Sequence, residues 1–254
     1  MSDFDNTLAY TDPSADKWAG KGGKTISREN CEAIRYFQSE GGLFTLSTGR
    51  PFRWLEQWSA YFRPNTYVST LNGAHICSPD GTDVIFSQPL DKEFIDLAKR
   101  IRAACPLLEW TSFHSVESGL VIKQGEQIDL SLFPDPIYKL VFFAPDAQSD
   151  AYAEAIAALI GDRYISMRSW INGIEIQKKG TGKGDAVKRL KSVLGDRARI
   201  VVAAGDYEND VDMVRAADIG YAVANAVPAL KAVAHRQTVS VREHAIARII
   251  EELQ

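Results

Sequence analysis

Apolar strand-like segments alternate with helix-like segments at the two ends of this 254-residue chain, and the alternation breaks down between them. The first part predicts a helix over residues 26–42, followed by strands at 43–46 and 66–70. The last part predicts helices and strands in turn at 181–194, 199–203, 209–216, 219–223, 227–234 and 244–253. Such alternation is typical of a parallel sheet covered by helices on both faces. We therefore expect an α/β fold with a doubly wound, Rossmann-like parallel-sheet core.

The middle of the chain has a different pattern. A strong turn at Pro79-Asp80-Gly81-Thr82 is flanked by strand-like residues on both sides. Strands and helices then mix without strict alternation, which is typical of an α+β unit. Here the predicted helices are 92–104 and 150–160, and the predicted strands are 119–123, 138–143, 164–169 and 173–177. We expect residues 1–77 and 178–254 to form the core, and residues 78–177 to form an inserted cap domain.

Composition excludes several kinds of partner. The formal net charge is −4 without a block of like charges, so no nucleic acid is expected. No apolar run is long enough for a membrane span and no signal peptide is recognisable, so we expect no membrane partner and a cytoplasmic location. Three distant cysteines and four scattered histidines predict neither a disulfide framework nor a zinc site. The sequence carries no indication of the oligomeric state.

Four polar segments lie where strands of the predicted core end. They are Asp3-Phe4-Asp5, Ser47-Thr48-Gly49-Arg50, Gly182-Lys183-Gly184 and residues 205–210. In doubly wound sheets, ligands bind at the carboxyl ends of the strands near the topological switch point. Clustered carboxylates suit a hard cation, and a lysine beside glycine-rich turns suits a phosphate. Each segment alone has an ordinary structural explanation as a turn, helix start or surface residue, but their joint occurrence favours a functional site.

These segments resemble the motifs of the haloacid dehalogenase superfamily, and within it the Cof-like sugar phosphatases with a large α/β cap. The first motif is Asp-Phe-Asp-Asn-Thr-Leu at 3–8, and the second is Leu-Ser-Thr-Gly-Arg-Pro at 46–51. The third contains Lys183, and the fourth is Gly-Asp-Tyr-Glu-Asn-Asp-Val-Asp-Met at 205–213. The four motifs occur in the family's order and cover nearly the whole chain.

The resemblance implies a phosphatase that acts on a small phosphorylated metabolite, and a sugar phosphate is the expected substrate. Asp3 would attack phosphorus and form an aspartyl-phosphate. Asp5 would protonate the leaving oxygen and then activate water. Thr48, Gly49 and Lys183 would bind the transferring phosphoryl group.

The resemblance also implies a Mg²⁺ cofactor. The ion would bind the carboxylates of Asp3 and Asp206 and the main-chain carbonyl of Asp5. Asn209 would contact phosphate or a metal-bound water, and Asp210 would orient Lys183 or the ligands of the metal. Two other functions stay open at this point, a phosphosugar mutase with the same aspartate chemistry and a non-catalytic phosphate-binding regulator.

Several residues keep more than one interpretation. Arg50 fits a structural salt bridge as well as a substrate contact. Trp110, His114 and Trp170 are interpreted first as ordinary core or rim residues, with contact to substrate as the alternative for each. Asn6 replaces the family's usual glycine, and we expect the turn to survive because asparagine tolerates left-handed backbone geometry.

The beginning of the chain also departs from the family. Only Met1 and Ser2 precede Asp3, so we expect either that apolar residues of the natural first strand are missing or that this central strand is short. The long loop 9–25, which contains Trp18, is either a flap over the site or a simple connection.

Overall fold

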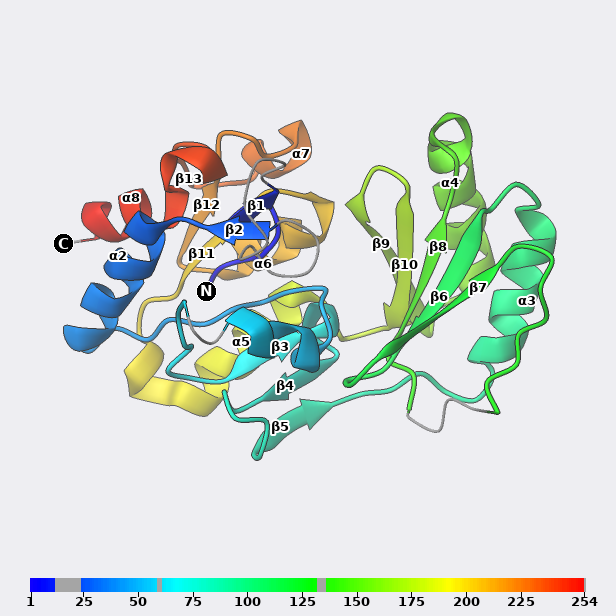
Figure 1. The fold of residues 1–254 in the computed structure, drawn as a ribbon, viewed down its shortest axis with the longest axis horizontal. Coiled ribbons are helices and arrows are strands. Elements are labelled where there is room, and N and C mark those ends of the chain that lie inside the picture. Colours follow the sequence, from blue (N-terminus) through cyan, green and yellow to red (C-terminus); the bar gives the residue numbers. More distant parts are fainter. Residues whose placement is uncertain (12–23, 59–60, 132–135, 254) are drawn as a thin grey trace.

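The structure, a computed structural model, describes residues 1–11, 24–58, 61–131 and 136–253, which form two lobes (Figure 1). We call them the core lobe and the cap lobe. The helices of the core lobe are α2 (Arg28–Ser39), α5 (Lys183–Leu194), α6 (Val211–Ala216), α7 (Pro228–Lys231) and α8 (Ala245–Glu252). The helices of the cap lobe are α3 (Phe94–Ala104) and α4 (Ser149–Ile160). None of the helices described here is both long and apolar enough to cross a membrane.

Two groups of strands form the sheet of the core lobe. In one group β12 lies between β11 and β13, and all three run parallel. In the other group β4 pairs antiparallel with both β3 and β5. These strands are β3 (Val68–Thr70), β4 (His75–Cys77), β5 (Val84–Ser87), β11 (Val202–Gly205), β12 (Ile219–Ala222) and β13 (Arg236–Gln237).

Single residues near the start of the chain join the two groups of strands. Ser2 forms parallel bridges with Ala204 of β11 on one side and with Leu46 on the other. Ser47 then bridges Ser69 of β3, also in parallel. From Ser2 the chain first adds strands toward β3 and later returns to add β11, β12 and β13 on the opposite side. The strand order therefore reverses at Ser2, which is the topological switch point of the sheet.

Helices cover both faces of this sheet, with α2 and α8 together on one face and α5 and α6 on the other. Adjacent residues of β11 show the two faces. Ala204 belongs to the apolar cluster that includes Ile34 of α2, whereas Ala203 packs with Val187 of α5 and Met213 of α6. Successive side chains of a strand point to opposite faces, so the core has three layers. The predicted doubly wound α/β core is confirmed.

A five-stranded antiparallel sheet forms the cap lobe, with the order β7-β6-β8-β10-β9. One face is apolar and packs on α3 and α4 through residues such as Phe113 and Leu140. The alternate residues, including Ser112 and Lys139, face the core lobe and line a cleft. The strands are β6 (Trp110–His114), β7 (Gly119–Lys123), β8 (Lys139–Phe143), β9 (Tyr164–Trp170) and β10 (Gly173–Lys178).

Some elements differ from the expected ones. Strand β6 lies inside the cap sheet but was not predicted, because polar residues interrupt its apolar ones. Strand β5 begins at Val84, beyond the expected domain boundary at residue 78, yet it pairs with β4 in the core lobe. We therefore propose a core domain and an inserted cap domain in which β5 belongs to the core.

The ends of the loop 9–25 form a short hairpin. Strand β1 (Ala9–Thr11) pairs antiparallel with β2 (Lys24–Ile26). Residues 12–23, including Trp18, lie outside the described residues, so the expected flap or connection stays a prediction there.

Candidate active site

Asp3 directly follows the switch point of the sheet. Its backbone N–H donates to the carbonyl of Ala204 at 2.9 Å, and the residue is only 6% exposed. The next residue, Phe4, is fully buried and packs on Trp58 with 5.2 Å between ring centroids. Asn6 has a φ of 59°, the left-handed geometry that was expected to be tolerated there. These contacts fix Asp3 at the edge of the sheet where ligands bind.

Lys183 is the first residue of α5 and connects two carboxylates. Its Nζ donates to Oδ1 of Asp3 and to Oδ1 of Asp210, each at 2.6 Å. Burial alone would lower the pKa of Lys183, but the two carboxylates outweigh this effect and raise the pKa above its ordinary value. Gly184 allows α5 to approach closely, because a Cβ there would lie 2.6 Å from the carbonyl oxygen of Asp212. The lysine is therefore charged and fixed in place.

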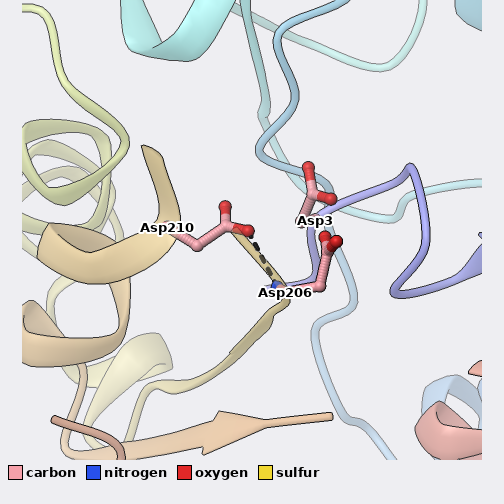
Figure 2. A group of neighbouring side chains, drawn as sticks. All are labelled: Asp3, Asp206 and Asp210. Atoms are coloured by element: carbon pink, nitrogen blue, oxygen red, sulfur yellow. Dashed lines mark hydrogen bonds between the residues drawn. The ribbon is translucent and has the colours of Figure 1, made fainter. Parts of the chain in front are cut away.

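Three buried carboxylates gather beside this lysine (Figure 2). One oxygen each of Asp3, Asp206 and Asp210 lies within 4.8 Å of the others. Burial, together with the charges of Asp3 and Asp210, raises the pKa of Asp206 to about 9. Burial also raises the pKa of Asp3 to about 7, against the opposing charge of Lys183. When all three carboxylates are ionised, they exceed the one ammonium by two negative charges, which a divalent cation with oxygen ligands would neutralise.

The two oxygens of Asp210 already have partners. Oδ1 accepts the bond from Lys183, and Oδ2 accepts backbone N–H bonds from Asp206 at 2.9 Å and from Tyr207 at 3.2 Å. The bond between Asp206 and Asp210 is drawn in Figure 2. Asp210 is therefore suited to orienting the lysine and the loop, and Asp3 and Asp206 are better placed to hold a cation.

Asp5 lies beside two cations. Arg50 donates to both of its oxygens, through Nε and Nη2 at 2.7 Å each, and Nζ of Lys24 lies 3.1 Å from Oδ1. Burial would raise the pKa of Asp5, but these two cations lower it below its ordinary value. The guanidinium of Arg50 also lies 5.2 Å from the ring centroid of Phe4 and 5.9 Å from that of Trp54. Arg50 thus forms a salt bridge with an expected site residue.

Thr48 and Gly49 lie at the end of the neighbouring strand segment. Thr48 is 1% exposed, and its Oγ1 accepts the backbone N–H of Arg50 at 3.2 Å. The carbonyl of Gly49 accepts a bond from Nζ of Lys139, a cap residue, at 2.8 Å. A Cβ at Gly49 would lie 3.0 Å from Oδ1 of Asn72, so a side chain would crowd this loop. Both residues are near the cleft, and their expected contact with phosphate stays a prediction.

Asn209 joins a hydrogen-bond network between the lobes. Its Nδ2 donates to Oγ of Ser169 in the cap lobe at 2.9 Å and to Oδ1 of Asn72 in the core lobe at 3.2 Å. Asn72 in turn donates to Oε2 of Glu175, and Oε1 of Glu175 accepts from Lys139 at 2.8 Å. The side chains of Lys139 and Glu175 are 4% and 1% exposed. The network ties cap strands β8, β9 and β10 to two loops of the core site.

Sequence reasoning missed Lys139 and Glu175. A signal for them exists, since each is a charged residue next to apolar residues of its strand. Lys139 opens β8 before four apolar residues, and Glu175 lies between Ile174 and Ile176 in β10. Charged residues are rarely buried without a partner, so two isolated charges of opposite sign in apolar strands indicate a buried pair.

A cleft of about 480 Å³ lies between the lobes, above the carboxylates. Asp3, Asp5, Asp206 and Asn209 line its core side, and the cap sheet lines the other side. Trp110, His114 and Trp170, which were interpreted as ordinary core or rim residues, also line it. The structure therefore brings Asp3, Asp5, Gly49, Asp206 and Asn209 together at one cleft, whereas Thr48, Lys183 and Asp210 are not among the residues that line it.

A family model described as haloacid dehalogenase-like hydrolase matches residues 1–250 of the chain. The chain belongs to this family. The match covers both lobes and all four motif segments, and it confirms the family predicted from the motifs.

Curated relatives cover the chain almost completely. A Bacillus subtilis protein, 5-amino-6-(5-phospho-D-ribitylamino)uracil phosphatase, is 25% identical over 267 residues, covering 98% of this chain and 95% of its own length. A Haemophilus influenzae relative is 36% identical over 268 residues, with 99% of this chain and 96% of the relative covered. The predicted enzyme class, a phosphatase, is confirmed at this level.

Solved structures share the fold. A haloacid dehalogenase-like phosphatase from Bacteroides thetaiotaomicron superposes with a TM-score of 0.79 at 18% identity, covering 99% of this chain and 92% of its own. A subclass IIB sugar phosphatase of the same superfamily has a TM-score of 0.78 at 18% identity, covering 99% and 97%. These structures contain the two-lobed α/β arrangement seen here, which confirms the predicted fold class.

Proposed function

We propose that this haloacid dehalogenase-like hydrolase is a Mg²⁺-dependent phosphomonoester hydrolase that forms an aspartyl-phosphate on Asp3. Its substrate would be a small phosphorylated metabolite, and a sugar phosphate is the class that the sequence resemblance favours. One observation carries the proposal. At the switch point of the sheet, the three carboxylates of Asp3, Asp206 and Asp210 gather around the single ammonium of Lys183.

Asp3 is suited to attack phosphorus. Its backbone is fixed by the central sheet, and one carboxylate oxygen is held by Lys183, which leaves the other for attack. Lys183 would also neutralise charge on the oxygens of the transferring group, and its fixed position means that little reorganisation is needed during reaction. The phosphoryl group would then reside on Asp3 until water removes it.

Asp3 and Asp206, with the carbonyl of Asp5, would hold the Mg²⁺. The ion supplies charge neutralisation between the carboxylate of Asp3 and the negatively charged phosphoryl group. Asp210 would keep Lys183 and the loop at Asp206 in position through the bonds described above.

Asp5 would act as the general acid and base of the reaction. As the ionised form held by Arg50 and Lys24, it suits the role of base for the attacking water. Protonation of the leaving oxygen requires the protonated form of Asp5, so its contacts with Arg50 and Lys24 must first weaken. Substrate entry is the event that would change these contacts, because Asp5, Arg50 and Lys24 all line the cleft.

The proposal is tested by phosphate release from acetyl phosphate, with and without Mg²⁺, for the wild type and Asp3→Asn. An amide has nearly the same shape but is a poor nucleophile, so turnover should fall by at least about a thousandfold without unfolding. Asp212→Asn is the matched control, since Asp212 is close in sequence but has an 80% exposed side chain. Activity of Asp3→Asn within about tenfold of wild type would exclude Asp3 as the nucleophile.

A phosphosugar mutase is the second candidate, because it would use the same aspartate. Product analysis distinguishes the two reactions, since a hydrolase releases inorganic phosphate and a mutase returns an isomeric sugar phosphate. A non-catalytic regulator would bind phosphate esters without turnover. The complete set of Asp3, Asp5, Lys183 and Asp206 favours an enzyme over a regulator.

A further inference from the structure

Aromatic and apolar side chains from the cap lobe, with one from the core lobe, line part of the cleft. Three of the five tryptophans of the chain lie there, Trp54 from the core lobe and Trp110 and Trp170 from the cap lobe. Val121 and Val141 complete this surface, which we call the tryptophan wall. It shares one cleft with the carboxylates of the core site.

Several side chains of the tryptophan wall are exposed to solvent, in the core lobe as well as on the inner face of the cap sheet. Trp54 is 43% exposed, Trp170 36% and Val121 57%. The opposite face of the same sheet already supplies the apolar core of the cap lobe with α3 and α4. Apolar groups left in water on the inner face therefore gain stability only when something covers them. A ligand that occupies the cleft would cover them.

Two polar groups beside the wall already have hydrogen-bond partners within the protein. Both oxygens of Glu175 are bonded, one to Lys139 and one to Asn72. The imidazole Nε2 of His114 is bonded to Oγ of Ser112 at 2.7 Å. Burial, with the nearby charge of Lys139, lowers the pKa of His114 to about 3, so this ring is neutral. Nδ1 of His114 has no hydrogen-bond partner among the described residues, so it can bond one polar edge atom of a ligand ring that lies against the wall.

We propose that the leaving group of the substrate carries an aromatic or heteroaromatic ring, which binds against the tryptophan wall while the phosphate lies at Asp3 and Lys183. The inference rests on the proposed function, and it replaces the sugar phosphate favoured by the sequence resemblance with a phosphate ester that carries a flat ring. Indole rings stack on flat rings in offset or edge-to-face geometry, and this adds to the effect of the buried area. The wall thus selects the ring, and the carboxylate and lysine cluster acts on the ester common to all substrates.

Three phosphate esters and one acyl phosphate test the ring directly in the wild-type enzyme with Mg²⁺. Naphthylmethyl phosphate has a flat ring, cyclohexylmethyl phosphate a puckered apolar ring, glucose-6-phosphate a polyol ring, and acetyl phosphate no ring. We expect kcat/KM for naphthylmethyl phosphate to exceed that for the two other ring compounds by about tenfold, the scale of one aromatic stacking contact. A value for glucose-6-phosphate equal to or above that for naphthylmethyl phosphate would overturn the inference and leave the phosphatase intact.

Substitutions in the tryptophan wall test whether it causes the preference for a flat ring. Trp54→Ala and Trp170→Ala should each lower kcat/KM for naphthylmethyl phosphate about tenfold and for acetyl phosphate less than about threefold. Trp54→Phe and Trp170→Phe keep a ring and should recover most of the loss. Leu107→Ala is the matched control, because Leu107 is an apolar cap residue with 56% exposure that is outside the residues lining the cleft. Equal losses for both esters would contradict a role of the wall in ring selection.

Binding to Asp3→Asn separates failure of this inference from failure of the proposed function. Calorimetric titration with naphthylmethyl phosphate and with glucose-6-phosphate needs no turnover. Tighter binding of the naphthyl ester by about tenfold supports the ring site even if no ester is hydrolysed by the wild type. Equal or weaker binding overturns the ring site, whatever the outcome of the activity assays.

Discussion

At the scale of single residues, one lysine and three aspartates determine the electrostatics of the site. Lys183 bonds to Asp3 and Asp210, and Asp206 has no cation of its own among the bonds described. The site therefore holds more carboxylates than the protein itself can neutralise. We expect this imbalance to make the stability of the protein depend on both pH and Mg²⁺.

The metal-free protein should lose stability as pH rises from about 4 to about 9. The pKa of Asp3 is raised to about 7 and that of Asp206 to about 9. At a pH between the ordinary aspartate pKa and these raised values, the folded protein therefore binds more protons than the unfolded chain. Stability then falls with rising pH. Mg²⁺ binds the ionised carboxylates, so the rise in Tm on adding Mg²⁺ to EDTA-treated protein should be larger at about pH 8.5 than at about pH 6.

Asp206→Asn removes the largest of these shifts and should flatten the pH dependence in EDTA. It should also reduce the rise in Tm caused by Mg²⁺, which differential scanning fluorimetry measures in the same samples. A rise in Tm that is the same at both pH values, or unchanged in Asp206→Asn, would contradict the assignment of the cation to these carboxylates.

At the scale of elements, much of the core could be predicted from the sequence. The helix expected over 26–42 is α2, and Ser27 caps it by accepting the N–H of Asn30 at 3.3 Å. Such local signals depend on a few neighbouring residues. The four polar segments could likewise be placed at strand ends because parallel strands end at a common edge.

The residues that the cap lobe contributes to the cleft could not be predicted from such local signals. Strand β6 has polar residues that face the cleft, so its alternation lacks the apolar character of an ordinary buried strand. The bonds between Lys139, Glu175 and Asn72 join residues far apart in the sequence, and no local pattern specifies them. The tryptophans of the cap appear as ordinary apolar residues until the sheet shows which face they occupy.

The buried pair between β8 and β10 allows a sharp test of this element. Glu175→Gln keeps the shape of the side chain but leaves Lys139 charged and buried, so the free energy of unfolding should fall by about 3–5 kcal/mol. The double variant Glu175→Gln with Lys139→Met removes the unpaired charge and should recover part of this loss.

Urea unfolding measures these changes, and Glu154→Gln on α4 is the control because Glu154 is exposed. The control should change stability by less than about 0.5 kcal/mol. A similarly small change for Glu175→Gln would mean that the pair between Lys139 and Glu175 does not hold the cap strands.

At the scale of the whole molecule, the two lobes meet around the cleft through polar contacts. Arg168 of β9 donates to both oxygens of Glu208 in the core lobe, at 3.2 and 3.0 Å. Asn209, next in the chain, bonds to Ser169 of the same strand. The loop that contributes Asp206 is therefore also a loop that the cap contacts, and closing the cap would position substrate against the site.

Glu208→Gln should weaken the closed arrangement without altering the catalytic carboxylates. The pair is partly exposed, at 22% and 37% for the two side chains, so it contributes up to about 1 kcal/mol. We expect KM to rise about fivefold with a smaller change in kcat. Glu32→Gln is the control, because it breaks an ion pair with Arg28 inside the core lobe. Equal effects on KM in both variants would argue against a role of this contact in cap closure.

The most direct measurement for the central claim is the site of the phosphoryl group during turnover. Asp5→Asn should slow hydrolysis of the intermediate, because the base that activates water is lost. After this variant is mixed with acetyl phosphate and Mg²⁺ and quenched in acid, mass spectrometry should find one phosphoryl group on the peptide containing Asp3. Phosphate release in the wild type without phosphorylation at Asp3 in this trap, or a phosphoryl group on another residue, would contradict the account.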